Sequence, residues 1–239
     1  MKKIIDNLKT LLIALIIAIL IRSFFFQPFY IPSSSMEPSL LVGDRIFVSK
    51  YTYGFSKHSF PFSPPIYNSR LFHKEPHRGD LIVFKTPTDN RTDYIKRLIG
   101  FPGDTIQFLG GNLVLNGEII ERKIVEHNYK NRCGPFKFDF NYYKEKLPNG
   151  IEHLVAYKKE NTFDYEKIYK VPNDSYFLMG DNRDCSNDSR IDLGFVPKIN
   201  LVGKAQVVFF SNDTNKSSVL KFWNWHKSIR GDRFFKKLK

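Results

Sequence analysis

Three consecutive serines, Ser33, Ser34 and Ser35, could supply a nucleophile directly after an apolar N-terminal segment. A serine hydroxyl is weak at its free pKa, so this role requires a neighbouring base that takes up its proton. Two other roles compete with it. Serines in such a place are commonly linker, and Ser34 with Glu37 matches the S-x-x-E capping box of a helix N-terminus. On this stretch alone, a linker or a cap is the favoured interpretation.

The base for Ser35 would be a histidine or a lysine. Lys96 lies in YIKRLIG, where period-two alternation places Tyr94, Lys96 and Leu98 on one face of a strand. Burial among apolar neighbours would lower its pKa from about 10.4 toward ~7 to 8 and provide a neutral amine. The competing interpretation, favoured from this segment alone, is an exposed basic pair with Arg97. The six histidines lie in polar or Pro-rich stretches outside clear strand-and-turn motifs: His58, His73, His77, His127, His153 and His226.

A third segment, MGDNRDCSNDSRIDLGFVP, concentrates charged and hydroxyl side chains: Asp181, Arg183, Asp184, Ser186, Asp188 and Arg190. A calcium loop starting at Asp184 is disfavoured, because Ser189 replaces the required Gly and Phe195 stands where a bidentate Glu is needed. We therefore expect a hydrogen-bonded polar loop with Asp–Arg pairs. Its serines could also orient a neighbouring lysine.

The element that precedes the serines is apolar from Leu11 to Ile21 and continues to Phe26 across Arg22. The short run alone has the length of a signal-peptide core, whereas the extended run of 16 residues is just long enough to span a bilayer. The far flank has no small-x-small cleavage site, and Phe24 to Tyr30 resemble an interfacial aromatic belt. We therefore expect an uncleaved anchor. Lys2, Lys3 and Lys9 precede the run, so the N-terminus is expected in the cytoplasm and the rest outside.

The remaining sequence predicts β structure. Segments such as RGDLIVFKTP and LVGKAQVVFF place β-branched and aromatic residues beside Gly, Pro, Asp and Asn turns. Asn116-Gly117 between apolar runs is typical of a type I′ hairpin. Residues 58–77 are Pro-rich and are expected to form an exposed extension, while 120–168 are more polar and are expected to be irregular.

Composition narrows the classes of function. The net charge of +13 suits binding to phospholipid or to nucleic acid equally, but no helix-turn-helix, zinc-finger or RRM signature supports nucleic acid.

The chain has only two cysteines, Cys133 and Cys185, which excludes a disulfide scaffold and a four-cysteine zinc site. Their spacing leaves one disulfide possible, although we favour two unpaired thiols.

The segment near the C-terminus combines aromatic residues with lysines and arginines, and its aromatic residues are Trp223, Trp225, Phe234 and Phe235. It is expected either to contact a membrane surface or to be a solvated tail.

Taken together and in this order, the anchor, SSSMEPSLLVGDRIFVSKYTYG, RGDLIVF, YIKRLIGFPGD and MGDNRDCSNDSRIDLGFVP resemble the bacterial type I signal peptidases (leader peptidases), a Ser/Lys dyad family. The resemblance covers roughly residues 33–104 and 179–205. It implies a mostly β fold, in which an N-terminal transmembrane helix precedes an all-β catalytic domain with an inserted second β-rich lobe.

The same resemblance implies the roles of individual residues. Ser35 would be the nucleophile and Lys96 the general base. Ser33 would donate its hydroxyl to the oxyanion hole beside the backbone N–H of Ser35, and Ser186 would orient Lys96. Asp181, Asp188, Arg190 and Met36 would support the site. Ser34 and Cys185 depart from the family pattern, which often has Gly and Asn at these positions.

The implied reaction is removal of N-terminal signal peptides from exported preproteins with small residues at −1 and −3, without a metal or another cofactor. The expected location is the bacterial cytoplasmic membrane, spanned once, with the catalytic domain on the outer (periplasmic) face. The partners would be preproteins and the phospholipid bilayer, not nucleic acid. Rival hypotheses are a peptidase of the same fold for a single pilin-like substrate, a non-catalytic membrane- or partner-binding β domain, and, ranked last, a self-cleaving repressor.

The chain is accordingly divided into six parts. Residues 1–9 form a cytoplasmic N-terminus, and 10–28 form the anchor. Residues 29–104 and 179–215 form the two parts of the catalytic core, which 105–178 interrupt as an inserted lobe. Residues 216–239 form a basic aromatic C-terminal segment.

Overall fold

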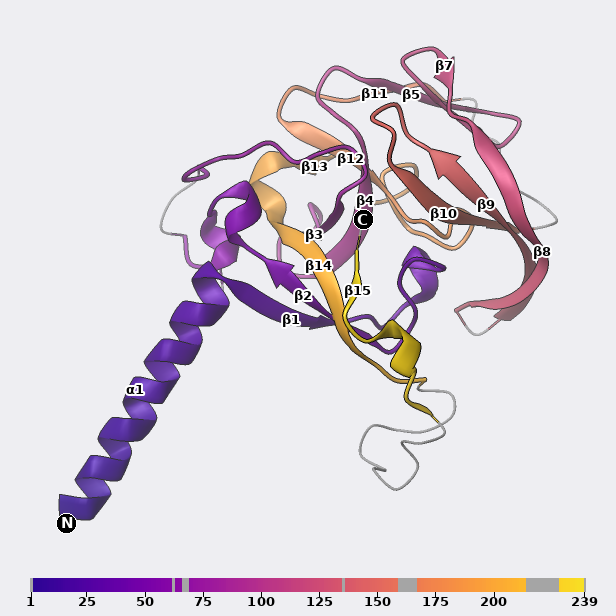
Figure 1. Cartoon of the computed structure of the whole chain (residues 1–239). Helices are drawn as coiled ribbons and strands as arrows, with labels where there is room; N and C mark the ends of the chain where they lie inside the picture. The colour runs from indigo at the N-terminus through magenta and orange to yellow at the C-terminus, as the bar shows by residue number, and fades with distance from the viewer. Residues whose placement is uncertain are drawn as a thin grey trace.

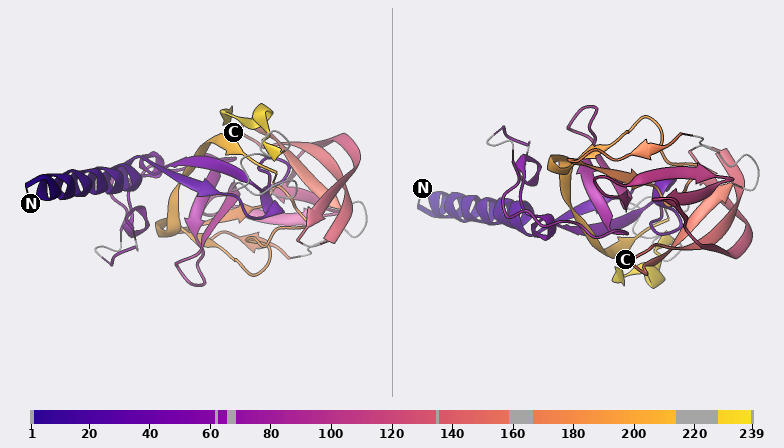
Figure 2. Two further views of the ribbon diagram at one scale, coloured as in Figure 1. Left: turned by 90° about the horizontal axis from the view of Figure 1, so that it is seen from below. Right: turned by 90° about the horizontal axis from the view of Figure 1, so that it is seen from above.

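The first element is a long apolar helix that projects from the rest of the molecule (Figures 1 and 2). The structure is a computed structural model that describes residues 2–61, 63–65, 69–134, 136–158, 167–213 and 228–238. Helix α1 (Lys2–Phe24) has 23 residues and is therefore about 35 Å long, enough to cross a hydrocarbon core of about 30 Å. Its apolar side chains from Ile4 to Ile21 are exposed, and only Phe24 at its end packs against other described rings, those of Phe55 and Phe60. These features are those of a membrane anchor, which lipid must cover.

The largest sheet is antiparallel and has the order β1-β2-β14-β3-β4-β12-β13, with β15 paired to β14. Its strands are β1 (Phe26–Tyr30), β2 (Asp44–Ser49), β3 (Leu81–Lys85), β4 (Asp93–Gly100), β12 (Ser175–Met179), β13 (Val196–Pro197), β14 (Leu201–Ser211) and β15 (Lys236–Lys237). Apolar side chains cover both faces of this sheet, because β3 and β4 contribute to two core clusters. This is the predicted mostly β architecture.

Two smaller sheets come from the middle of the chain (Figure 1). One has the order β11-β5-β6-β7 and the other β10-β9-β8. Their strands are β5 (Thr105–Leu109), β6 (Asn112–Leu115), β7 (Glu118–Ile119), β8 (Arg122–Cys133), β9 (Phe136–Lys146), β10 (Glu152–Lys158) and β11 (Tyr169–Lys170). Asn116 and Gly117 between β6 and β7 have φ of 54° and 86°, the positive values that a type I′ turn requires.

The expectation that residues 120–168 are irregular is wrong for β8, β9 and β10. Strands β8 and β9 are among the longest of the described residues, with 12 and 11 positions. They lack a continuous apolar pattern because much of the hairpin faces solvent, while backbone hydrogen bonds between its strands hold it together. Hydrophobic alternation is a weak signal for such a strand.

The expectation of two free thiols is also wrong. Cys133 at the end of β8 and Cys185 in the loop after β12 form a disulfide, with their Cα atoms 5.5 Å apart. The two residues pack against a small cluster around Phe140. The bond links two segments that are 52 positions apart, and a spacing of this kind does not reveal proximity in the fold.

One-turn 3₁₀ helices connect several strands: η1 (Ser34–Met36), η2 (Tyr51–Tyr53), η3 (Lys57–Ser59), η4 (Lys198–Asn200) and η6 (Gly231–Arg233). The expected exposed extension at 58–77 begins instead with buried His58 and Ser59. Near the C-terminus, the ring of Phe234 lies 5.5 Å from that of Phe210, so this part folds back on β14. Trp223 and Trp225 lie outside the described residues.

Candidate active site

Ser35 and Lys96 meet although 61 positions separate them. Ser35 lies in the one-turn helix η1, and Lys96 lies in the middle of β4. The Lys96 Nζ is 2.8 Å from the Ser35 Oγ. Both residues are buried, with 9% of Ser35 and 4% of Lys96 exposed. A serine hydroxyl and an amine at this distance form the arrangement that proton transfer between them needs.

The surroundings of Lys96 favour its neutral form. Burial lowers the pKa of Lys96 to about 8, although Asp188 and Asp181 act in the opposite direction. Its Nζ also donates to the carbonyl of Ile95 at 3.1 Å and lies 5.2 Å from the centre of the Tyr94 ring. A useful fraction of the amine is therefore unprotonated near neutral pH. The expectation of an exposed Lys96–Arg97 pair is wrong, because both side chains are buried.

Ser33 lies on the other side of the Ser35 hydroxyl. The two Oγ atoms are 3.3 Å apart. Ser33, not Ser34, is the N-cap of η1, and its side chain makes no capping hydrogen bond. The capping-box interpretation of Ser34 and Glu37 is therefore wrong. Ser33 instead lines the cavity beside the Ser35 hydroxyl, and its part in the oxyanion hole stays a prediction.

A largely apolar cavity of about 380 Å³ opens beside these residues. Its walls come from β1, β2, β3, the first half of β4, η1 and the loop after β12. Its apolar lining includes Ile31, Met36, Ile46, Val83 and Ile95. In β4, residues Asp93–Lys96 pair with β3 on one side. Strand β12 pairs only with the second half, so within the described residues Asp93–Lys96 have an open edge. A peptide could add there as a further strand.

Asn182 hydrogen-bonds the backbone of the serine segment, a role that the sequence did not reveal. Its side chain donates to the carbonyl of Ser34, and its backbone N–H donates to the carbonyl of Ser35, both at 3.1 Å. Gly180 is equally close. A Cβ added to Gly180 would lie 2.5 Å from the Ser35 carbonyl oxygen and 2.2 Å from the Ser186 Oγ. The loop after β12 therefore positions the backbone of Ser35 directly.

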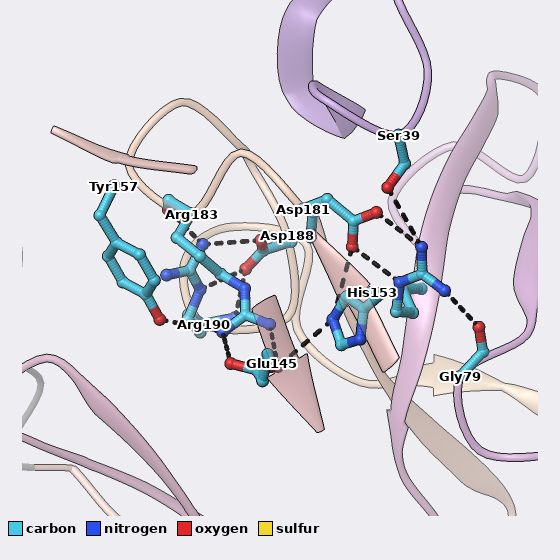
Figure 3. A network of polar contacts seen from close by, with 11 residues as sticks. Ser39, Gly79, Glu145, His153, Tyr157, Asp181, Arg183, Asp188 and Arg190 are labelled. Carbon is cyan, nitrogen blue, oxygen red and sulfur yellow. Dashed lines mark hydrogen bonds and ion pairs between the residues drawn. The ribbon is translucent and has the colours of Figure 1, made fainter. Parts of the chain in front are cut away.

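Buried ion pairs fix this loop (Figure 3). Asp181 accepts hydrogen bonds from Arg97 Nε and Nη2 at 2.8 and 2.7 Å, and Asp188 accepts from Arg190. Asp188 also accepts from the backbone N–H of Gly180 at 2.9 Å. Nearby arginines hold the pKa of both carboxyls below its ordinary value despite burial. The expected Asp–Arg pairs are present, but Arg97 of β4 supplies one of them.

The network continues into the second lobe through Glu145 and Tyr157, to which the sequence motifs assign no role. Arg183 donates to both carboxylate oxygens of Glu145 in β9 and to the hydroxyl of Tyr157 in β10. His153 in β10 lies between Glu145 and Asp181, with its Nε2 at 3.3 and 3.9 Å from their oxygens (Figure 3). Burial and Arg97 lower the pKa of His153. Polar residues on polar strands provide no sequence signal for such a network.

The other predicted residues are nearby but have less direct contacts. The Ser186 hydroxyl is buried and makes no hydrogen bond to any residue that the structure describes. Its part in orienting Lys96 stays a prediction. Met36 is completely buried in the core cluster beneath the site. Met36 thus anchors η1, the turn that carries Ser35.

Comparison with known proteins identifies the family. Residues 4–210 match the family model described as signal peptidase, peptidase S26. Signal peptidase I of Rickettsia akari (strain Hartford) is 40% identical over 240 residues, which cover 93% of this chain and 88% of the relative. The Rickettsia typhi (strain ATCC VR-144 / Wilmington) protein is also 40% identical, with 93% and 89% covered. A crystal structure of a signal peptidase I from Enterococcus faecalis V583 is 27% identical, with a TM-score of 0.33, and covers 55% of this chain and 97% of that chain. The chain therefore belongs to the signal peptidase family, peptidase S26.

Proposed function

We propose that this membrane-anchored peptidase removes N-terminal signal peptides from exported preproteins, with Ser35 as nucleophile and Lys96 as general base. The observation that carries the assignment of residues is the 2.8 Å contact between the Ser35 Oγ and the buried Lys96 Nζ. A pKa of about 8 for Lys96 supports the same roles, because only the neutral amine accepts a proton.

In the proposed reaction, neutral Lys96 takes the hydroxyl proton of Ser35 as Oγ attacks the carbonyl carbon of the scissile bond. The resulting oxyanion is stabilised by the Ser33 hydroxyl and the backbone N–H of Ser35. The Lys96 ammonium then gives its proton to the leaving amine, which releases the mature protein and leaves an acyl-enzyme. Lys96 next takes a proton from the water that attacks the ester carbonyl carbon. The Lys96 ammonium returns this proton to the Ser35 Oγ as the ester bond breaks, which frees the signal peptide and restores both the serine hydroxyl and the neutral amine.

The supporting residues act through position and charge. Asp188 and Asp181 attract the Lys96 ammonium that forms during the reaction, while Arg190 and Arg97 neutralise the two carboxylates at rest. Ser186 is proposed to hydrogen-bond the lysine once substrate excludes water. Each of the two oxyanion donors can lower the activation barrier by on the order of 3 kcal/mol.

The proposed substrate binds as an added strand along Asp93–Lys96 and places its −1 and −3 side chains against the apolar cavity. The alternation of a strand supports this, because residues two positions apart point to the same side. Apolar side chains such as the methyl group of Ala at −1 and −3 suit the apolar lining of this cavity.

The proposed location is the bacterial cytoplasmic membrane, with the catalytic domain on the outer (periplasmic) face. Lys2, Lys3 and Lys9 precede the apolar run and favour a cytoplasmic N-terminus. The proposed division has a core of 29–104 and 179–215 with an inserted lobe of 105–178. The two separate sheets formed by β5 to β11 support it, but β12 (Ser175–Met179), at the end of the proposed lobe, pairs with β4 in the large sheet.

The test is cleavage of a preprotein with an Ala-x-Ala site by the detergent-solubilised protein, followed by N-terminal sequencing of the product. Ser35→Ala should abolish cleavage, whereas Ser34→Ala is the matched control and should retain it. Cleavage that survives Ser35→Ala would place the nucleophile elsewhere. If the wild-type protein cuts only one member of a panel of unrelated preproteins, a general role in preprotein processing is wrong and a peptidase for a single substrate is favoured.

A further inference from the structure

A second cavity lies where the anchor meets the sheet, and it is rich in positive charge. We name it the basic cavity. It has a volume of about 410 Å³, and its lining includes Arg22, Lys50, Lys85 and Arg91. Asp93 is the one carboxylate among its lining residues, and Lys85 already pairs with it at 2.9 Å. The cavity therefore has a surplus of positive charge.

Lys50 is the most deeply placed of these cations, with 2% of the residue exposed. Its Nζ donates to the carbonyl oxygen of Ser59, but in the described part of the chain no carboxylate lies within 4.0 Å of it. Burial and the neighbouring Arg22 lower the pKa of Lys50 to about 8, although Asp93 acts in the opposite direction. A buried ammonium without a carboxylate partner is costly, and an anion in the cavity would offset that cost.

His58 provides a second, independent observation. Only 3% of this cavity-lining residue is exposed, and its Nδ1 contacts the Ser63 Oγ at 3.0 Å. Its Nε2 is buried and has no hydrogen-bond partner among the described residues. Burial and the positive charge of Lys57 lower the pKa of His58 to about 4, so the ring is neutral. In the tautomer in which the Ser63 hydroxyl donates to Nδ1, the ring proton is on Nε2, which is then an unused donor.

The place of the basic cavity indicates the source of the anion. Arg22 lies in the last turn of α1, at the end of the apolar segment. The ring of Phe24 packs against those of Phe55 and Phe60 at 5.4 and 5.6 Å, and Phe60 also lines the cavity. Aromatic rings at the end of a spanning helix lie at the level of the lipid headgroups. The cavity therefore opens at the depth at which lipid phosphates lie.

We propose that the basic cavity binds the phosphate of an anionic phospholipid headgroup in the leaflet at which α1 ends. Arginine and lysine are the side chains that bind phosphate oxygens, and the excess of cations favours a lipid with net negative charge over a zwitterionic one. This inference depends on α1 as a membrane anchor and not on the roles of Ser35 and Lys96. Its test therefore measures binding, so it can fail or succeed independently of cleavage.

The experiment titrates the full-length protein in detergent with phosphatidylglycerol and counts bound lipids by native mass spectrometry. Phosphatidylcholine with the same acyl chains is the comparison, and inorganic phosphate is the competitor. We expect one phosphatidylglycerol to bind at least about fivefold more tightly than phosphatidylcholine, the ratio that one or more well-placed cations provide. Equal affinities for the two lipids would overturn the proposal, as would complete displacement by millimolar inorganic phosphate, which would identify free phosphate as the ligand.

Two matched pairs of variants locate the site. Arg22→Gln should weaken phosphatidylglycerol binding about fivefold, whereas Lys9→Gln, a change near the other end of α1, should not. Lys50→Gln should weaken it similarly, whereas Lys74→Gln outside the cavity should not. Preprotein cleavage in detergent reports that each variant is folded. Equal weakening by the control changes would show attraction to net charge alone and overturn the assignment to the basic cavity.

Discussion

Arg97 follows Lys96, the lysine that contacts Ser35, and its Nε and Nη2 donate to the two carboxylate oxygens of Asp181. This bidentate pair joins β4 to the loop after β12, and both side chains are almost fully buried. Since the same loop carries Asn182 and Gly180, one ion pair sets the distance between the base and the backbone of the nucleophile.

Asp181→Asn should destabilise the protein because it leaves the Arg97 guanidinium buried without its counter-ion. We expect a loss of about 3 kcal/mol, or a decrease of roughly 6 to 12 °C in the Tm. Thermal unfolding followed by circular dichroism measures this loss. Glu152→Gln is the control, because its pair with Lys144 is half exposed and should contribute less than about 1 kcal/mol. Equal Tm values for Asp181→Asn and wild type would show that the pair does not hold the loop.

Cleavage should depend on pH through the titration of Lys96. The active form is the neutral amine, and the pKa of Lys96 is lowered to about 8. Below that value kcat/KM should fall about tenfold per pH unit, and above about pH 9 it should level off. The measurement is kcat/KM for a short peptide substrate from pH 6 to 10. A flat profile between pH 6 and 9 would contradict a lysine base.

Ser33→Ala should lower kcat by about 10² to 10³ with little change in KM, because the hydroxyl stabilises charge that exists only in the transition state. Ser33→Thr keeps the hydroxyl and should recover part of the rate. Steady-state kinetics of both variants beside Ser34→Ala separate the oxyanion role from local packing. A Ser33→Ala enzyme with unchanged kcat would remove Ser33 from the oxyanion hole.

The anchor, the mostly β architecture and the family could be predicted because each corresponds to a local pattern in the sequence. An apolar run, turn residues between short strands and four ordered motifs can all be read along the chain. The Ser35–Lys96 contact was expected only through the family resemblance, since each segment taken alone favoured a cap or an exposed basic pair. Burial, which gives Lys96 its altered pKa, depends on the tertiary packing around β4, which no local pattern in the sequence reports.

The unpredicted residues of the site lie in the second lobe and in the loop after β12. Glu145 and His153 come from strands whose polar character resembles that of a surface, and only packing against the loop after β12 buries them. The disulfide was missed for the same reason, because contact between β8 and this loop is a property of the tertiary fold. Asn182 acts through backbone carbonyls, which no side-chain pattern reveals.

Loss of the disulfide should destabilise the contact between the lobe and the loop. Cys133→Ser with Cys185→Ser opens a loop of 52 positions, for which chain entropy predicts a loss of up to about 4 kcal/mol. Because either cysteine alone breaks the bond, Cys133→Ser should lower the Tm almost as much as the double variant. Thermal unfolding with and without reductant measures this. If the wild-type protein reacts with a thiol reagent before reduction, the bond is absent.

Gly180→Ala should inactivate the enzyme by displacing the nucleophile. The new Cβ would lie 2.5 Å from the Ser35 carbonyl oxygen, 2.2 Å from the Ser186 Oγ and 2.4 Å from the Ser186 Cβ. A backbone oxygen cannot yield as a flexible side chain does, so η1 must move, and we expect kcat/KM to fall at least about 10²-fold. Gly231→Ala is the matched control, because nothing lies within 4 Å of its Cβ position.

Adding Ser186→Gly to Gly180→Ala separates the two sources of crowding. This second change removes the contacts with Ser186 but leaves the clash with the Ser35 carbonyl, so the double variant should be far less active than Ser186→Gly alone. Recovery of activity would assign the effect to Ser186 and not to the nucleophile's backbone. Wild-type activity of Gly180→Ala itself would show that the loop after β12 does not position Ser35.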